Sequence, residues 1–428
     1  MIKKRYVVLS FLCSLSIITY LDRLCISVAG PRMQAELGFT PAQWGWIVGI
    51  FAVSYGAFEI PNGALGDRWG QRGMLTRIVV WWSAFTGLTG TASSFAWLLV
   101  IRFLFGVGEA GAFPNMSGAV SRWFPATERA RAQGLIWGAS RTGGVISPLL
   151  VIPMMTLFGW RATFWIFGGV GVVWAVAWWG WYRNYPALQP GITPRELEEI
   201  GPGSKPPSHT GMPWGKLARA RQLWKVMLMY SFYGWGSYFY LSWLHTYLVK
   251  GRGLTEREMG FFSTLPFVLG AAANVAGGFL GDHLSKKYGL KMGRRVVGCF
   301  GLSLAAIFVL STALTTGKAA GVIFISLGYG AMDMMLPSAW ATCLDLGGRY
   351  AGAVSGAMNS SGHVGGFLSS VLFGYLVQRF GNYNAPLFVI ATMLAISAFL
   401  FSRIDASRPL LAEDDELVEE AKRLATGH

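Results

Sequence analysis

Charged residues are scarce in this chain. Only 13% of its 428 residues are Asp, Glu, Lys or Arg, against roughly 25% in soluble proteins, while 53% are hydrophobic. The four cysteines and five histidines lack the spacing of a disulfide framework or a metal site. P-loop, G-x-S-x-G and H-E-x-x-H motifs are also missing. The low charge rules out an ordinary soluble enzyme, and the missing motifs predict no catalytic activity, no metal site and no cofactor.

Apolar segments dominate the chain instead. Uncharged stretches of about 20 residues, the length that crosses a bilayer as a helix, recur from end to end. Lys3-Lys4-Arg5 and the apolar run after it look like a signal peptide, but the run is long and lacks a small-residue cleavage site. The sequence predicts an all-α integral membrane protein with twelve transmembrane helices, near 6–29, 42–65, 75–94, 96–120, 132–155, 162–183, 223–248, 258–281, 296–315, 319–341, 351–377 and 385–403.

The basic residues predict the orientation in the membrane. The net charge is +15, but most of the 36 Lys and Arg lie in the short connections on one side of the predicted spans. By the positive-inside rule that side is cytoplasmic, as are both termini. No basic face is left for a nucleic acid, so the lipid bilayer is the expected surroundings.

A proline-rich segment divides the predicted spans into six and six. We expect an N-terminal six-helix half at 1–184, a cytoplasmic linker at 185–221, a C-terminal six-helix half at 222–404 and an acidic cytoplasmic tail at 405–428. Within the linker, Thr193-Pro194-Arg195-Glu196 has the pattern of a capping box with proline at the first helical position, which predicts a short surface helix.

Two motifs occur once in each half, about half a chain length apart. The first is Gly63-x-x-x-Asp67-Arg68 after the second span and Gly278-x-x-x-Asp282 after the eighth; the second is Arg131-x-x-Gly134 and Arg349-x-x-Gly352, which open the fifth and eleventh. These coincidences indicate a duplication. Duplicated six-helix halves are typical of transporters, in which one half rocks against the other around a central site.

Further motifs support a family resemblance. They are Tyr20-Leu21-Asp22-Arg23, Arg102-x-x-x-Gly106-x-x-Glu109-Ala110, Gly347-Gly348-Arg349-Tyr350-Ala351-Gly352 and the loop from Gly63 to Arg72. With them the chain resembles the major facilitator superfamily over nearly its whole length and, within it, the anion:cation symporter family. The resemblance implies the major facilitator fold in two pseudo-repeat halves. For bacterial members it also implies uptake of hexuronates, aldonates or aldarates with protons.

Charges inside the predicted spans are the main functional signal, because each costs about 2.5 to 3.5 kcal/mol at mid-helix. Arg23 is a fork-shaped donor suited to a substrate carboxylate, a role that the resemblance also implies; the alternative is a permanent salt bridge. Glu109 is a candidate proton carrier, as the resemblance implies, or else a packing charge paired to Arg102. Arg102 lies two turns from Glu109 on nearly the same helix face, where it can tune that acid. Asp22 is a second proton-coupling candidate that exchanges partners, or a static ion-pair member.

The other polar residues inside spans allow two interpretations each, apart from Glu59. Arg141 departs from the family pattern: it contacts a second anionic group of the substrate, or it neutralises a nearby acid. Asp333, four residues before Pro337, is a weaker coupling candidate or caps a helix break. Glu59 is assigned to packing. Asn359 and His363 lie one turn apart and can hydrogen-bond substrate hydroxyls or a neighbouring helix.

Two further sets complete the candidate residues. One aromatic residue of span seven, taken as Tyr238, is expected in the cavity with Tyr20, while the other aromatics of that span form an interfacial belt. The family resemblance implies that Asp67, Arg68 and, by the repeat, Asp282 form a conformational latch at the cytoplasmic ends of helices. The alternative for Arg68 is a pure positive-inside role.

The sequence thus predicts a secondary active transporter that imports a small organic anion, such as the sugar acids hexuronate or aldonate, by proton symport through alternating access. The proton is the coupling ion. We expect a monomer in a bacterial inner membrane. The alternatives are a facilitator or exporter of another solute on the same fold, and a membrane sensor that does not transport.

Overall fold

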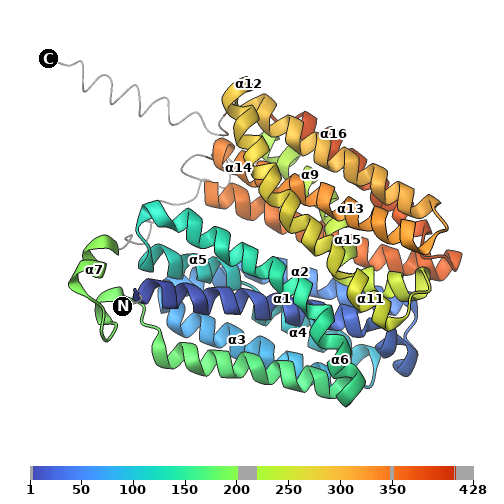
Figure 1. The fold of residues 1–428 in the computed structure, drawn as a ribbon, viewed down its shortest axis with the longest axis horizontal. Helices are drawn as coiled ribbons and strands as arrows, with labels where there is room; N and C mark the ends of the chain where they lie inside the picture. Colours follow the sequence, from blue (N-terminus) through green and yellow to red (C-terminus); the bar gives the residue numbers. More distant parts are fainter. Residues whose placement is uncertain (1–2, 201–218, 348–350, 409, 411–428) are drawn as a thin grey trace.

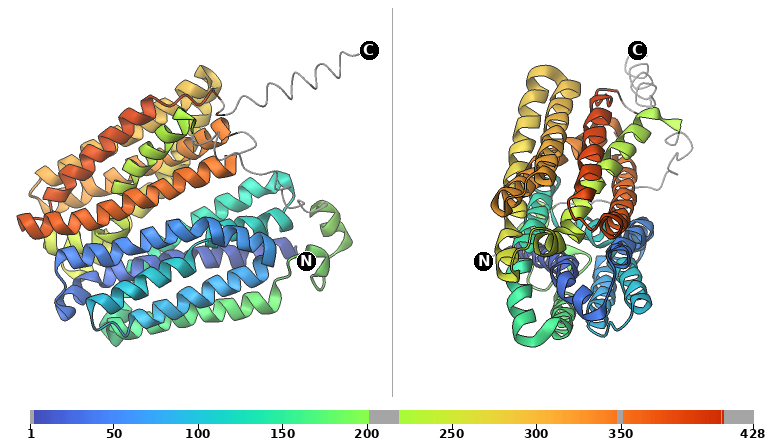
Figure 2. Two further views of the ribbon diagram at one scale, coloured as in Figure 1. Left: turned by 180° about the vertical axis from the view of Figure 1, so that it is seen from behind. Right: turned by 90° about the vertical axis from the view of Figure 1, so that its right-hand side faces the viewer.

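The chain folds into two bundles of helices. The computed structural model describes residues 3–200, 219–347, 351–408 and 410, and the regular elements of that part are helical throughout. The first bundle contains α1 (Lys4–Leu37), α2 (Pro41–Trp69), α3 (Gln71–Thr89), α4 (Phe95–Glu109), α5 (Ala112–Trp123) and α6 (Ala126–Trp181), followed by η1 (Pro186–Leu188) and α7 (Pro194–Ile200). The second contains α9 (Arg221–Ser242), α10 (Leu244–Thr246), η2 (Tyr247–Gly251), α11 (Glu256–Phe262), α12 (Thr264–Leu314), α13 (Lys318–Met334), α14 (Leu336–Gly347), α15 (Ala351–Phe380) and α16 (Ala385–Ser402). The bundles lie side by side (Figures 1 and 2).

Two of these helices reverse direction at a glycine. Gly159 in α6 has φ 78° and ψ 161°, and Gly289 in α12 has φ 82° and ψ 160°. L-residues with a side chain avoid this region, so glycine permits the sharp turn. Each element therefore contributes two antiparallel rods, and α6 accounts for the two predicted spans at 132–155 and 162–183.

Membrane-crossing length and composition are met by six stretches of the described chain: Lys4–Leu37, Phe95–Trp123, Gly134–Trp181, Glu256–Leu314, Lys318–Gly347 and Ala385–Ser402. The all-α, multi-pass membrane architecture expected from the sequence is confirmed. The number of spans and the domain limits at 184, 221 and 404 stay predictions, because residues 201–218 and most of the acidic tail lie outside the described residues.

The two bundles are held together at the predicted outer end. There Arg32 of α1 donates from Nε to both carboxylate oxygens of Glu256 in α11, at 2.8 and 2.9 Å. Lys250 donates to Gln34 at 3.2 Å. A Cβ on Gly45 of α2 would lie 2.6 Å from a backbone oxygen of α15, so the two helices touch there. Figure 1 shows the bundles converging at the α11 end and diverging toward α7 and α14.

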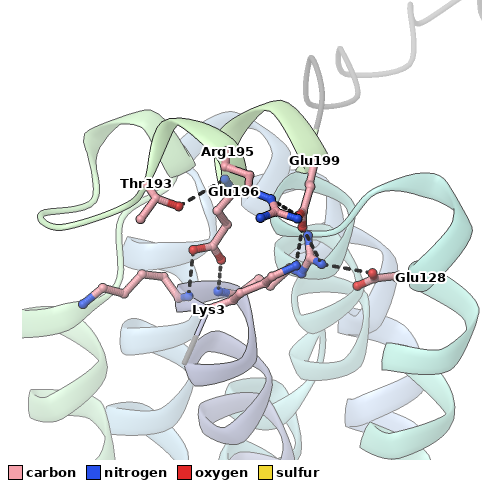
Figure 3. Close-up of polar contacts among 8 residues, drawn as sticks. Lys3, Glu128, Thr193, Arg195, Glu196 and Glu199 are labelled. Atoms are coloured by element: carbon pink, nitrogen blue, oxygen red, sulfur yellow. Dashed lines mark hydrogen bonds and ion pairs between the residues drawn. The ribbon is translucent and has the colours of Figure 1, made fainter. Parts of the chain in front are cut away.

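Helix α7 caps the start of α1 at the opposite end (Figure 3). The predicted short helix is confirmed at Pro194–Ile200, with the Thr193 hydroxyl accepting from the backbone N–H of Glu196 at 3.2 Å. The Glu196 carboxylate, however, accepts the backbone N–H groups of Lys4 and Arg5 at 3.0 and 2.9 Å. It thereby satisfies two of the free donors that every helix N-terminus presents.

Glu199 of the same helix adds an ionic contact. It pairs with Lys3 at 2.5 Å and with Arg5 at 3.1 Å, while Arg5 also reaches Glu128 of α6 at 3.0 Å. The hydrogen bond from Lys3, aided by the charges of Lys3 and Arg5, holds the pKa of Glu199 below its ordinary value. The contribution of this carboxylate is therefore present at neutral pH and is lost only as the pH falls through that lowered pKa.

Replacing Glu196 by Ala is expected to destabilise this end of the first bundle. Glu196 is 3% exposed, so the substitution leaves two backbone donors buried and costs about 1 kcal/mol, the usual value of a lost helix cap. Thermal unfolding of the purified protein measures the change. Glu198→Ala on the exposed face of α7 is the matched control, and equal melting temperatures for the two variants would show that the cap contributes nothing.

Candidate functional site

A broken helix presents Glu109 at the centre of the first bundle. Helix α4 ends at Glu109, and Gly111, with φ 88°, starts the turn into α5. The side-chain amide of Asn62 in α2 donates to the carbonyls of Val107 and Ala110, at 3.0 and 2.8 Å, and so satisfies backbone groups that the break frees. The Glu109 carboxyl is 0% exposed.

Arg23 of α1 pairs with that carboxyl. Its Nε donates to Oε1 of Glu109 at 2.6 Å, while Nη2 of Arg23 and Oε2 of Glu109 are buried without a hydrogen-bond partner among the described residues. Four aromatic rings surround the guanidinium, with centroids 4.6 to 5.9 Å away: Tyr55, Phe51, Tyr20 and Phe113. Cation–π attraction stabilises the charge while part of its donor fork stays unused.

Arg102 and Asp22 lie in the same region. The Arg102 guanidinium stands over the Phe105 and Phe51 rings at 4.6 and 5.2 Å. Arg102 Nε and both Asp22 oxygens are buried without hydrogen bonds in the described structure. A small pocket between the bundles brings the two arginines opposite residues of α9, and its lining is Arg23, Ile26, Val48, Phe51, Arg102, Tyr238, Leu241 and Ser242. The pocket therefore combines two cationic groups with aromatic and hydroxyl side chains.

A second ion pair crosses between the bundles. Arg141 of α6 lies 3.2 Å from Oδ2 of Asp333 in α13, and its Nη1 donates to the Tyr329 hydroxyl at 2.9 Å. Asp333 is 0% exposed and the Arg141 side chain 17%. Asp333 lies just before the junction of α13 and α14, where Asn274 of α12 donates to its backbone oxygen at 3.5 Å. The arrangement resembles that of Asn62 beside the α4 break.

A polar network links α2 to the second bundle. Asn359 of α15 donates to both carboxylate oxygens of Glu59 at 3.0 and 3.2 Å. His363 lies 3.7 Å from the same carboxylate, and its Nδ1 is 2.6 Å from the Tyr238 hydroxyl. Its ring also packs against Tyr55 at 4.9 Å, so the network borders the Arg23 cage. Three predicted binding residues are thus brought together: Glu59 is the common partner of Asn359 and His363, and His363 contacts Tyr238.

The expected latch residues lie at the other end of the molecule. Arg294 in α12 donates to Asp282 at 3.1 Å and to Asp345 of α14 at 3.2 Å. Arg68 is exposed, and the side chains of Asp67 and Arg131 lie outside the described residues. The described contacts of Asp282 stay within the second bundle, and the latch role remains a prediction.

Comparison with known proteins identifies the family. Residues 12–370 match the Major Facilitator Superfamily. The chain belongs to the major facilitator superfamily. It is 34% identical, over 96% of each chain, to a probable sulfoacetate transporter of Cupriavidus necator, and 29% identical, over 96% of each, to a hexuronate transporter of Bacillus subtilis. The expected resemblance to anion:cation symporter-type members is confirmed.

The fold agrees with that assignment. A solved inward-facing, unoccupied bacterial homolog of the human lysosomal transporter Spinster superposes with a TM-score of 0.79 at 20% identity, covering 94% of this chain and 97% of that one. The expected major facilitator fold is confirmed, and family and fold identify a membrane transporter rather than an enzyme.

Three charges predicted to lie inside spans, Arg23, Glu109 and Arg102, lie together in the first bundle. Glu59 was assigned to packing, although it accepts hydrogen bonds from a predicted binding residue of the other bundle. Its position as an acid inside a span was the available signal. Tyr55 and Tyr329 had no signal in the sequence, because a lone tyrosine in an apolar helix is ordinary.

Proposed function

We propose that this transporter imports an organic anion together with protons by alternating access. The observation that carries the proposal is the buried Arg23–Glu109 ion pair. Arg23 has a hydrogen-bond donor that Glu109 does not use. In the membrane interior, protonation of Glu109 would end its ion pair with Arg23 and leave the guanidinium free to bind an anion.

The mechanism follows from charge balance. While Glu109 is ionised, its carboxylate occupies Arg23. A proton that arrives on Glu109 cancels that charge and leaves the Arg23 fork to bind a carboxylate or sulfonate bidentately. Anion and proton thus enter together, since either alone leaves a buried charge without compensation. Asp22, whose oxygens have no hydrogen-bond partner among the described residues, and Arg102, which interacts electrostatically with Asp22 and Glu109, tune this exchange.

The substrate class is proposed from the relatives and the lining of the site. Their names point to sulfoacetate and to hexuronates, small organic acids with a strongly anionic end. Asn359, His363 and Tyr238 supply donors and acceptors for sugar hydroxyls, and Tyr20 supplies a ring beside Arg23. We propose a sugar acid or a related sulfonate.

Topology completes the proposal. We place the chain in a bacterial inner membrane as a monomer, with both termini cytoplasmic. With that orientation the contacts of Arg32 and Glu256 close the outer side, and Asp67, Arg68 and Asp282 latch the inner side in the alternate state. A proton is the coupling ion.

Uptake into proteoliposomes tests the function. The purified chain is offered labelled hexuronates, aldonates, aldarates and sulfoacetate, with and without an inward proton gradient. We expect accumulation above the external concentration only with the gradient, and collapse on addition of a protonophore. A facilitator would equilibrate the anion without accumulating it, and a sensor would be stabilised by ligand without flux; either result contradicts the proposal.

A further inference from the structure

The Arg141–Asp333 pair has no place in the exchange at Arg23. It joins α6 of the first bundle to α13 of the second, at 3.2 Å, and Asp333 is fully buried. Bundles that rock about a central site change the distances across their interface. A pair that crosses this interface must therefore separate or reorient in each cycle, and separation exposes two uncompensated charges.

Arg141 also lies beside the anion site. Tyr20 of α1, one turn before Arg23, interacts electrostatically with both arginines, and its ring lies 5.7 Å from the Arg23 guanidinium. Helix α6 touches α1 there, since a Cβ on Gly143 would lie 3.0 Å from the Tyr20 Cβ. The two arginines thus flank one tyrosine of the central region.

The two ion pairs are built alike. In each, a buried carboxyl at a helix break faces an arginine from another helix. Glu109 accepts from Arg23 through Oε1 and leaves Oε2 without a hydrogen bond among the described residues, whereas both Asp333 oxygens lie within 3.5 Å of Arg141 Nη2. The Arg141 side chain is 17% exposed, whereas that of Asp333 is fully buried.

We propose that Arg141 is a second anion subsite and Asp333 its proton acceptor, so that the preferred substrate is an organic dianion carried with two protons. This inference rests on the proposed function and adds the charge class of its substrate. One anionic group displaces Glu109 from Arg23, the other displaces Asp333 from Arg141, and each displaced carboxylate takes one proton.

Charge balance favours this over a permanent bridge. Before binding, each pair is neutral. After binding, two arginines face two anionic groups and both acids are protonated, so the site is again neutral. A dianion with two protons carries no net charge across the membrane. A monoanion fills only one subsite and leaves the Arg141–Asp333 bridge between the bundles in place.

The surroundings of Asp333 fit a single proton exchange. Tyr329 from its own helix and Tyr230, Tyr233 and Tyr240 from α9 interact electrostatically with it. These phenols are neutral at physiological pH. A Cβ on Gly270 of α12 would lie 2.8 Å from its carboxylate, so α12 approaches closely there, and the uncharged Asn274 of the same helix donates to the Asp333 backbone oxygen. Arg141 is the charged group that faces Asp333 in the described part of the chain.

Paired probes test the proposal in proteoliposomes of the full chain. Sulfoacetate is a dianion, and isethionate replaces its carboxylate by an alcohol; galactarate and galacturonate form a second pair. We expect wild-type dianion uptake to be driven by the pH gradient and insensitive to a potential set with valinomycin. Arg141→Gln should lower the ratio of dianion to monoanion uptake about ten- to a hundredfold, the range for losing a charge-assisted hydrogen bond.

Asp333→Asn gives an independent measurement. With one proton site removed, each dianion enters with one proton and a net negative charge. Its steady-state accumulation should then rise about tenfold for each ~60 mV of inside-positive potential. Arg161→Gln, just beyond the Gly159 turn of α6, is the matched control. The double variant R141Q with D333N removes both charges together, so it tests dianion selectivity if a single variant fails to fold.

The outcomes separate the two proposals. Anion accumulation in which Arg141→Gln reduces both members of a pair equally, or in which wild-type dianion uptake responds to potential, overturns the dianion inference while the proton-coupled function stands. Absence of gradient-driven uptake of every anion overturns both.

Discussion

Replacing Glu109 by Gln is expected to abolish accumulation driven by the proton gradient. Glutamine keeps the shape of the side chain but exchanges no proton, and it no longer neutralises Arg23. One coupled proton supports about tenfold accumulation of a monoanion for each pH unit, because a tenfold concentration ratio is equivalent to one unit of pH. In the variant this ratio should fall to one, and the pH dependence of the initial rate should flatten. Labelled uptake at several imposed gradients measures both.

The matched control for this substitution is Glu36→Gln. Glu36 lies at the predicted outer end of α1, where it accepts from the Trp160 indole and pairs with Arg161. It is a glutamate of the same bundle outside the proton path that we propose, so its variant should keep the gradient dependence. If the Glu109→Gln protein still accumulates substrate with the proton gradient, Glu109 is not the coupling acid. Asp22 would then be the next candidate.

The helical halves and the buried charges follow directly from the sequence, for physical reasons. A bilayer requires about 20 apolar residues per crossing, so hydropathy locates the spans with little competition from other signals. A charge at membrane depth is costly enough that Arg23, Arg102 and Glu109 stand out without any structure. The α7 helix can also be predicted from the sequence, because Thr193 and Pro194 are capping residues that act within one helical turn.

The sequence does not predict which residues these charges contact. Glu59 and Asn359 lie 300 residues apart, and nothing local relates them. Arg141 departs from the family pattern, but nothing in the sequence names Asp333, 192 residues away, as its partner. The capping-box pattern predicts that Glu196 caps its own helix. Its carboxylate instead accepts two backbone N–H groups at the N-terminus of α1. Tertiary packing decides each of these contacts, whereas periodicity and capping decide only the helices.

Replacing Arg23 is expected to have the largest effect on substrate affinity. Arg23→Ala removes a bidentate, charge-assisted contact, worth about 1.5 to 3 kcal/mol per hydrogen bond, and leaves Glu109 buried without its partner. Uptake at low substrate concentration should fall at least about a hundredfold. Arg23→Lys keeps the charge but loses the fork and the stacking on Tyr55 and Phe51, so an intermediate loss of about tenfold is expected.

Combining the two substitutions separates binding from folding. If Arg23→Ala only destabilised the bundle, then adding Glu109→Gln, which removes the stranded acid, would restore both the melting temperature and the thermal shift with substrate. If Arg23 binds the anion, the double variant should regain stability while its thermal shift with substrate stays lost. Arg161→Ala, at a half-buried arginine near the outer end, controls for loss of a paired arginine away from the site. Equal uptake by Arg23→Lys and the wild type would exclude a planar donor fork and leave a simple point charge as the function of Arg23.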